Sequence, residues 1–258
     1  MTLLDVKGLH KSFGGVVAAR DVAFTVARGE MLAIIGPNGA GKSTVFNMVG
    51  GQLRPDRGQV LLDGQDITHA SPQKRFRRGV GRTFQVAQTF LSMSAAENVQ
   101  MALISCFRQS NGLWTPARDR HREKALELLS QVGMFGAADV HCSALAYGDV
   151  KRVELAIALA GQPKLLLMDE PTAGMAPRER AALMDLTASI AKSQGIGVLF
   201  TEHDMDVVFG HAARVLVLLR GQIIASGTPD EVRQDAQVRR AYLGDERALE
   251  PAKGISPA

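Results

Sequence analysis

Cysteine is scarce in this sequence, and no long apolar run is present. The two cysteines, Cys106 and Cys142, lie in unrelated contexts without the spacing of a metal site, and no secretory apolar region stands at the N-terminus. We therefore expect a reducing, cytosolic environment. A membrane-spanning helix needs about 18 consecutive apolar residues, whereas the apolar runs at 165–168 and 215–219 are only as long as strands. The chain is therefore not expected to span a membrane itself.

A strong excess of charge of one sign is also missing. The 258 residues include 30 Lys and Arg against 26 Asp and Glu, which gives a formal net charge of +4. The basic residues are scattered, apart from one small cluster formed by Lys74, Arg75, Arg77, Arg78 and Arg82. We interpret this cluster as a solvated or partner-facing surface, because it is too small for the basic stripe of a nucleic-acid-binding protein. No nucleic acid partner is expected.

A complete phosphate-binding motif follows an apolar run near the N-terminus. Residues 31–35 read Met-Leu-Ala-Ile-Ile, residues 36–43 read Gly-Pro-Asn-Gly-Ala-Gly-Lys-Ser, and apolar residues then recur at helical spacing. This order of strand, loop and helix is the context that a G-x-x-x-x-G-K-[ST] motif requires. Its glycines let backbone N–H groups surround an anion, and the positive end of the helix dipole points to the same place. We therefore predict that the chain binds a nucleoside triphosphate.

The loop offers several kinds of group to this ligand. Lys42 supplies a positive charge for the β- and γ-phosphates, and Ser43 supplies a hydroxyl for Mg²⁺. The residues predicted to bind the nucleotide here are Gly36, Pro37, Asn38, Gly39, Ala40, Gly41, Lys42, Ser43 and Thr44.

Two carboxylates end the apolar run at 165–168. Asp169 and Glu170 would lie at the carboxyl end of a buried parallel strand, where open α/β sheets bind their ligands. We predict that Asp169 holds Mg²⁺ through water, and that Glu170 orients or deprotonates the water that attacks the γ-phosphate. A further strand at 196–200 runs into His203 at the same edge. We predict that His203 contacts the γ-phosphate.

Two N-terminal segments predict a small antiparallel sheet. Residues 1–35 contain short alternating runs broken by glycines, and residues 56–67 have the pattern of a hairpin with Asp63-Gly64 at its turn. Phe13 lies beside two glycines in the first segment. Its ring could stack on a nucleobase or fill the core, and the spacing alone leaves both interpretations open.

Residues 92–160 show helical spacing instead. We therefore predict an α/β domain over residues 1–244, in which a helical subdomain at 92–160 is inserted into a nucleotide-binding core formed by 1–91 and 161–244. The segment 245–258 contains two prolines and a glycine, and we expect it to be disordered.

Five motifs occur in a fixed order along the chain. They are the loop at 36–43, Arg-Thr-Phe-Gln with Gln85, Leu-Ala-Tyr-Gly-Asp at 145–149, Asp169-Glu170, and Thr-Glu-His-Asp at 201–204. In this order they resemble the nucleotide-binding subunits of ATP-binding-cassette transporters, over about residues 3 to 244, which implies a P-loop NTPase fold and ATP as the ligand. The segments 82–85, 145–148, 202–205 and 240–244 more narrowly resemble the ATPase subunits of branched-chain amino acid importers.

The resemblance implies further site residues. Gln85 would touch Mg²⁺ and the attacking water, and the segment between Gln85 and Asn98 would contact a membrane subunit. In the family, the motif that matches Leu145, Ala146, Tyr147, Gly148 and Asp149 binds the γ-phosphate held by a second subunit. Phe13 matches the aromatic residue that stacks on adenine.

The resemblance also implies partners and a location. The importer subfamily pairs two ATPase subunits, usually different ones, with two permeases and an extracytoplasmic receptor. We therefore expect a heterodimeric ATPase pair rather than a homodimer, at the cytoplasmic side of the cell membrane.

Three positions depart from the family's usual pattern. Ala146 replaces a serine, Asp149 replaces a glutamine, and Ala176 stands where many relatives have an aspartate. Asp149 is either an N-cap, which its position favours, or a carboxylate that points at the phosphates and repels them. The lack of an aspartate at Ala176 puts one contact with the second subunit in doubt. Because Glu170 and His203 are both present, we still expect hydrolysis.

Two other classes of cassette ATPase have to be considered. One is an ATPase of an exporter, for instance of lipid or lipopolysaccharide. The other is a soluble ATPase in translation or DNA repair, although such proteins usually carry two cassettes or a long coiled coil, which this chain lacks. A GTPase is a weaker alternative, because the sequence contains no Asn/Thr-Lys-x-Asp element for reading the base.

Overall fold

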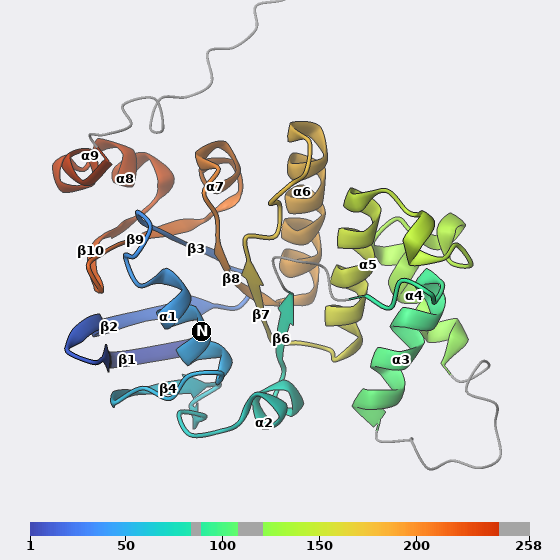
Figure 1. Ribbon diagram of the computed structural model, residues 1–258, viewed down its shortest axis with the longest axis horizontal. Coiled ribbons are helices and arrows are strands. Elements are labelled where there is room, and N and C mark those ends of the chain that lie inside the picture. Colours follow the sequence, from blue (N-terminus) through green and yellow to red (C-terminus); the bar gives the residue numbers. More distant parts are fainter. Residues whose placement is uncertain (84–88, 108–120, 243–258) are drawn as a thin grey trace, which may run out of the picture.

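The computed structural model describes residues 1–83, 89–107 and 121–242, and it forms an α/β protein with two sheets (Figure 1). Gln85 and the segment 245–258 lie outside the described residues. The predictions made for them therefore stay predictions.

The smaller sheet is antiparallel, as the sequence predicts. Its strand order is β2-β1-β4-β5, and its strands are β1 (Thr2–Phe13), β2 (Val16–Ala27), β4 (Arg57–Leu62) and β5 (Gln65–Asp66). Asp63 and Gly64 connect β4 to β5 with φ angles of 49° and 74°. Positive φ at both positions is typical of the type I′ turn that joins tight hairpins. The predicted hairpin is confirmed.

The larger sheet contains the three strands after which the sequence predicts site residues. Its strand order is β10-β9-β3-β8-β7-β6, and all neighbours are parallel except β10 and β9. The strands are β3 (Met31–Ile35), β6 (Val80–Thr83), β7 (Leu165–Asp169), β8 (Gly197–Thr201), β9 (Arg214–Leu219) and β10 (Gln222–Gly227).

We call the larger sheet the central sheet. Its strands β3, β7 and β8 are buried on both faces, and side chains that alternate along each strand pack into two different clusters. On β3, Leu32 and Ile34 pack with helix α1 (Lys42–Gly50) and with the inner face of the antiparallel sheet. Met31, Ala33 and Ile35 belong to a second cluster, which includes residues of α6 (Pro177–Gln194) and α7 (Met205–His211). The packing of α1 against Leu32 and Ile34 holds this helix in place after β3.

Helices occupy the described part of the segment 92–160, which we propose as the inserted subdomain. They are α3 (Ala95–Phe107), α4 (Arg122–Gln131) and α5 (Tyr147–Ala160), with short 3₁₀ turns at Phe135–Ala137 and Cys142–Ala144. The three helices stand together at one side of the molecule (Figure 1). The remaining helices are α2 (Pro72–Arg77), α8 (Pro229–Gln234) and α9 (Ala236–Tyr242). None of the described helices is long and apolar enough to cross a membrane.

The basic cluster predicted as a surface is partly internal, so that prediction is wrong for Arg75. Only 1% of Arg75 is exposed. Its guanidinium donates hydrogen bonds to carbonyl oxygens of Thr68 and Ala70, and to those of Met48 and Val49 at the end of α1. Burial lowers the pKa of Arg75 to about 10. The end of a helix leaves carbonyls without partners, and Arg75 supplies donors to them.

Replacement of Arg75 by methionine should lower the free energy of unfolding by about 3 kcal/mol, because it leaves buried carbonyls without a donor. Urea unfolding of the full chain measures this loss. Arg77, which is exposed on the same helix, provides the control. Arg77→Met should change the free energy of unfolding by less than about 0.5 kcal/mol. Equal effects of both variants would contradict the buried role of Arg75.

Candidate active site at the carboxyl edge of the central sheet

The strands β3, β8 and β7 bring three site segments to one edge. Thr201 is aligned with Ile34 of β3 on one side and with Asp169 of β7 on the other. The loop after β3, Glu170 after β7 and His203 after β8 therefore all leave the sheet at its carboxyl edge. The structure thus brings together residues that lie more than a hundred positions apart in the sequence.

The phosphate-binding loop needs glycine at its two ends. Gly36 has a φ of 156°, and a Cβ atom there would lie 2.2 Å from the Leu218 carbonyl oxygen. Gly41 has a φ of 103°, and a Cβ atom there would lie 2.3 Å from the Ala18 carbonyl oxygen. Helix α1 begins directly after Gly41, which has no side chain to cap it. The first N–H groups of α1 are therefore left for an anionic ligand.

Lys42 lies inside this loop, with 8% of the residue exposed. Its Nζ donates hydrogen bonds to the carbonyl oxygens of Gly36 at 2.6 Å and Pro37 at 3.3 Å. Burial lowers the pKa of Lys42, while the negative charges of Glu170 and Asp169 act in the opposite direction. The ammonium group is thus placed between the loop and the two carboxylates, where a bound triphosphate would meet it.

Asp169 is the last residue of β7, and neighbours on both sides orient it. Its Oδ1 accepts a hydrogen bond from the Thr201 hydroxyl at 2.7 Å. Its Oδ2 lies 3.6 Å from a guanidinium nitrogen of Arg82, which also donates to Asn47 of α1. The carboxylate is therefore held in a fixed place beside α1. The exposed hydroxyl of Ser43 lies in the first turn of the same helix.

This set of oxygens fits Mg²⁺, which prefers oxygen ligands and is usually held by one or two carboxylates together with substrate phosphates. Within the described residues, no group of three or more His, Cys, Asp and Glu side chains is placed to hold a metal by itself. A magnesium ion here would therefore depend on the nucleotide for part of its coordination.

Glu170 and His203 face each other across the edge. Glu170 Oε1 lies 2.9 Å from His203 Nε2, and both side chains are partly exposed, by 23% and 50% respectively. The backbone of Glu170 has a φ of 46°, which is uncommon for a residue with a side chain. Its N–H donates to the Thr201 carbonyl at 3.1 Å, which holds this turn in place. The pair is accessible to a ligand bound in the loop.

The start of helix α5 differs from the prediction. The helix begins at Tyr147 with Ala146 in the N-cap position, so Asp149 is the third helical residue and its interpretation as an N-cap is wrong. The Asp149 N–H donates to the Ala146 carbonyl at 3.0 Å. Leu145 immediately precedes the cap, and a Cβ atom at Gly148 would lie 3.3 Å from the Glu179 carboxyl carbon. The motif at 145–149 thus packs against α6.

Phe13 lies at the end of β1 and is 49% exposed. Lys11 Nζ lies 5.5 Å from the centre of its ring. The ring therefore does not fill the core, which was one of the two interpretations. Its stacking on adenine stays a prediction.

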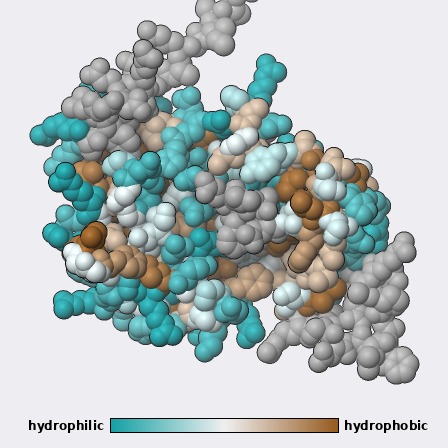
Figure 2. Space-filling model, in the orientation of Figure 1, coloured by the Kyte–Doolittle hydropathy of each residue, from teal (hydrophilic) through white to brown (hydrophobic). Residues whose placement is uncertain are grey.

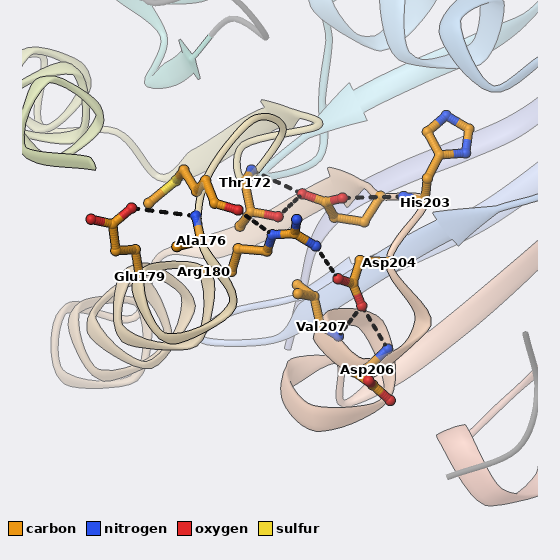
Figure 3. A network of polar contacts seen from close by, with 10 residues as sticks. Thr172, Ala176, Glu179, Arg180, His203, Asp204, Asp206 and Val207 are labelled. Atoms are coloured by element: carbon orange, nitrogen blue, oxygen red, sulfur yellow. Dashed lines mark hydrogen bonds and ion pairs between the residues drawn. The ribbon is translucent and has the colours of Figure 1, made fainter. Parts of the chain in front are cut away.

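The sequence patterns predict no role for Glu202, although it lies in the Thr-Glu-His-Asp motif at 201–204. Only 4% of Glu202 is exposed, and its carboxylate accepts hydrogen bonds from Thr172 and from the backbone of His203. A second contact lies nearby, because Arg180 in the first turns of α6 pairs with Asp204 at the start of α7 (Figure 3). The available signal was an acidic residue between a buried strand and a predicted catalytic histidine. Its partner Thr172 is 30 positions away in the sequence, which no local pattern reveals.

The fold and this edge define an ATPase of the ATP-binding-cassette class. A model of the ABC transporter family matches residues 19–173, and a model described as branched-chain amino acid ATP-binding cassette transporter matches residues 222–248. The protein LivG of Escherichia coli, a high-affinity branched-chain amino acid transport ATP-binding protein, is 38% identical over 250 residues. This match covers 94% of the chain and 98% of LivG. The chain belongs to the ABC transporter family, as one of its ATP-binding subunits.

Further relatives and a solved structure agree with this assignment. The branched-chain amino acid transport ATP-binding protein BraF of Pseudomonas aeruginosa is 37% identical, over 94% of the chain and 98% of BraF. The lipopolysaccharide export system ATP-binding protein LptB of Acidithiobacillus ferridurans is 38% identical, over 95% of the chain and 98% of LptB. A solved ATP-binding cassette of an ABC transporter in its ADP conformation superimposes with a TM-score of 0.84 at 32% identity, over 95% of the chain and 99% of that cassette.

The predicted family, its narrower resemblance and the predicted fold are thus confirmed. The protein binds ATP and is an ATPase that couples hydrolysis to transport. Membership of this family also implies a partner ATPase subunit and permease subunits.

Replacement of Glu170 by glutamine should reduce ATP turnover by about 100-fold or more, because it removes the carboxylate that we propose to act on the attacking water. ATP affinity should change little, since the loop at 36–43 is untouched. Phosphate release measures turnover, and a fluorescent ATP analogue measures binding. Glu127→Gln, at an exposed ion pair on α4, is the control and should retain activity. Normal turnover by Glu170→Gln would assign the chemistry to another group.

Proposed function

We propose that this chain is the ATP-hydrolysing subunit of a membrane importer for branched-chain or other hydrophobic amino acids, located at the cytoplasmic side of the membrane. The observation that carries this substrate class is the match of residues 222–248 to the branched-chain amino acid cassette model. The similarity to LivG and BraF, which are named for branched-chain amino acid transport, supports it.

The arrangement of the edge supports a mechanism for hydrolysis. Lys42 and the backbone of the loop 36–44 would hold the triphosphate. Ser43, Asp169 and Gln85 would hold Mg²⁺, which would neutralise phosphate charge. Glu170 orients or deprotonates the attacking water. His203 would donate a hydrogen bond to the γ-phosphate.

A second subunit completes each site in this proposal. The motif at 145–149 opens helix α5 and would face the γ-phosphate bound by the partner. A solved relative at 26% identity is a dimeric cassette in a post-hydrolysis state with ADP and phosphate, which supports such a pair. We propose a heterodimer, as in the importer subfamily. Asp149 lies in the first turn of α5 rather than at its cap, and its carboxylate would weaken the composite site that this motif forms.

One segment offers a surface for a permease. Phe90 and Leu91 are both 58% exposed, and they lie in the stretch between Gln85 and Asn98 for which the sequence predicts contact with a membrane subunit. The buried side chain of Asn98 accepts a hydrogen bond from the Phe90 N–H and donates to the Phe90 carbonyl. This fixes the turn that presents both side chains. Figure 2 shows hydrophobic residues gathering on the side of helices α3 to α5.

Export is the alternative function. LptB of Acidithiobacillus ferridurans, named for lipopolysaccharide export, has the same 38% identity to the chain as LivG of Escherichia coli. The match of residues 222–248 favours import. The permease that accompanies the chain would decide between the two.

Purification of tagged Glu170→Gln protein from detergent-solubilised native membranes with Mg-ATP should recover a second ATPase subunit and two permeases. Mass spectrometry identifies them. Permeases that support uptake of branched-chain amino acids would establish the importer. Lipopolysaccharide-export subunits would establish the alternative. Recovery of the chain without any membrane protein would contradict both.

The double substitution Phe90→Ser and Leu91→Ser should reduce recovery of the permeases by at least about 10-fold, because it removes apolar contact area at the centre of the proposed surface. ATP binding should be unchanged. Phe135→Ser, at a phenylalanine that is 60% exposed on a different turn, is the matched control. Equal recovery with both variants would place the permease elsewhere.

A further inference from the structure

The buried carboxylate of Glu202 joins the two loops that carry the proposed hydrolysis residues. Figure 3 shows its partners Thr172 and His203. Glu202 Oε1 accepts hydrogen bonds from the Thr172 N–H at 2.9 Å and the Thr172 hydroxyl at 2.6 Å. Its Oε2 accepts one from the His203 N–H at 3.1 Å. Thr172 follows Glu170 by two residues, and His203 is the next residue after Glu202. One side chain therefore touches both loops close to their functional groups.

The donors around this carboxylate explain why it is glutamate. All three are N–H or O–H groups, and an ionised carboxylate is a pure acceptor with room for several such bonds. A glutamine could still accept both bonds from Thr172 through its oxygen. Its NH₂ group would then face the His203 N–H, donor against donor. Burial of a carboxylate costs free energy unless its hydrogen bonds are made. Thr172 and the His203 backbone must therefore both stay within hydrogen-bonding distance of Glu202.

We infer that Glu202 is a positioning residue for ATP hydrolysis, which holds the Glu170 loop and the His203 loop at the separation that the reaction needs. This inference rests on the roles proposed for Glu170 and His203. Those two side chains are 2.9 Å apart, and Glu202 is hydrogen-bonded to the His203 backbone and to Thr172, two residues after Glu170. A displacement of about 1 Å at a reacting group can cost about 100-fold in rate. A small shift of either loop is therefore enough to slow turnover.

A second link between the loops keeps them together without Glu202. Arg180 Nε donates to the Met175 carbonyl at 2.7 Å, and its Nη1 forms an ion pair with Asp204. Asp204 also caps helix α7 through the N–H groups of Asp206 and Val207. This link joins the start of α6 to the start of α7, farther along the chain than Thr172 and His203. Loss of the bond to the His203 N–H should therefore misplace the His203 ring, and loss of a bond to Thr172 should misplace Glu170, rather than unfold the segment.

The substitution Glu202→Gln in the full chain should lower kcat for ATP by about 10- to 100-fold. The KM for ATP should stay within about 3-fold, because the loop at 36–43 binds the nucleotide. In a His203→Ala background, Glu202→Gln should cost less than about 2-fold more, since both changes act on the same group. Steady-state phosphate release gives kcat and KM, and thermal unfolding reports the fold.

Thr172 provides a test that keeps the carboxylate in place. Thr172→Val removes the hydroxyl donor and should lower kcat, whereas Thr172→Ser retains it and should restore kcat. If Glu202→Gln does not fold, the comparison of Thr172→Val with Thr172→Ser tests the positioning role instead. The control is Glu231→Gln on α8, where a carboxylate accepts a hydrogen bond from the Thr228 N–H at 2.7 Å, in the same kind of contact.

Three results would overturn the inference. They are wild-type kcat in Glu202→Gln, equal kcat in Thr172→Val and Thr172→Ser, and full additivity with His203→Ala. Glu170→Gln separates this failure from that of the proposed mechanism. If Glu170→Gln abolishes turnover while the Glu202 and Thr172 variants do not, only the positioning role fails. If Glu170→Gln itself turns over normally, the proposed roles at this edge fail with it.

Discussion

The parallel alignment of β3, β8 and β7 is the constraint on which the active site depends. Each strand is buried on both faces, so its polar groups can appear only where it ends. Because neighbouring strands end together, the phosphate loop, Glu170 and His203 meet at one edge. The loop then passes directly into α1, whose uncapped N-terminus lies at the proposed phosphate site. The same hydrogen-bond ladder that stabilises the sheet therefore sets the relative positions of the residues that we propose for hydrolysis.

Short-range patterns predicted most of this arrangement. The loop at 36–43 and the strand ending in Asp169 combine a chemical motif with a clear apolar run, and each is decided within about ten residues. The turn at Asp63-Gly64 is equally local, because few residue pairs adopt positive φ at both positions. The family resemblance added what spacing does not contain, which is the proposed role of the motif at 145–149 at the nucleotide of a second subunit.

The missed features depend on contacts that are distant in sequence. Arg75 belongs to a basic cluster, and composition does not reveal that it faces the end of α1. Asp149 was interpreted as a cap because it is a good capping residue, but α5 begins two positions earlier at Tyr147, after an alanine that gives no capping signal. The role inferred for Glu202 depends on its hydrogen bonds with Thr172, which is distant in the sequence. In two of these three cases a buried charge is satisfied largely by backbone groups, which sequence patterns do not display.

The most direct test of the account is an experimental structure of Glu170→Gln protein with its partners, ATP and Mg²⁺. The account predicts ATP with its phosphates in the loop at 36–43, His203 at the γ-phosphate, and the motif at 145–149 of this chain facing the nucleotide held by the other ATPase subunit. ATP bound away from the carboxyl edge of the central sheet, or His203 turned away from the γ-phosphate, would contradict it.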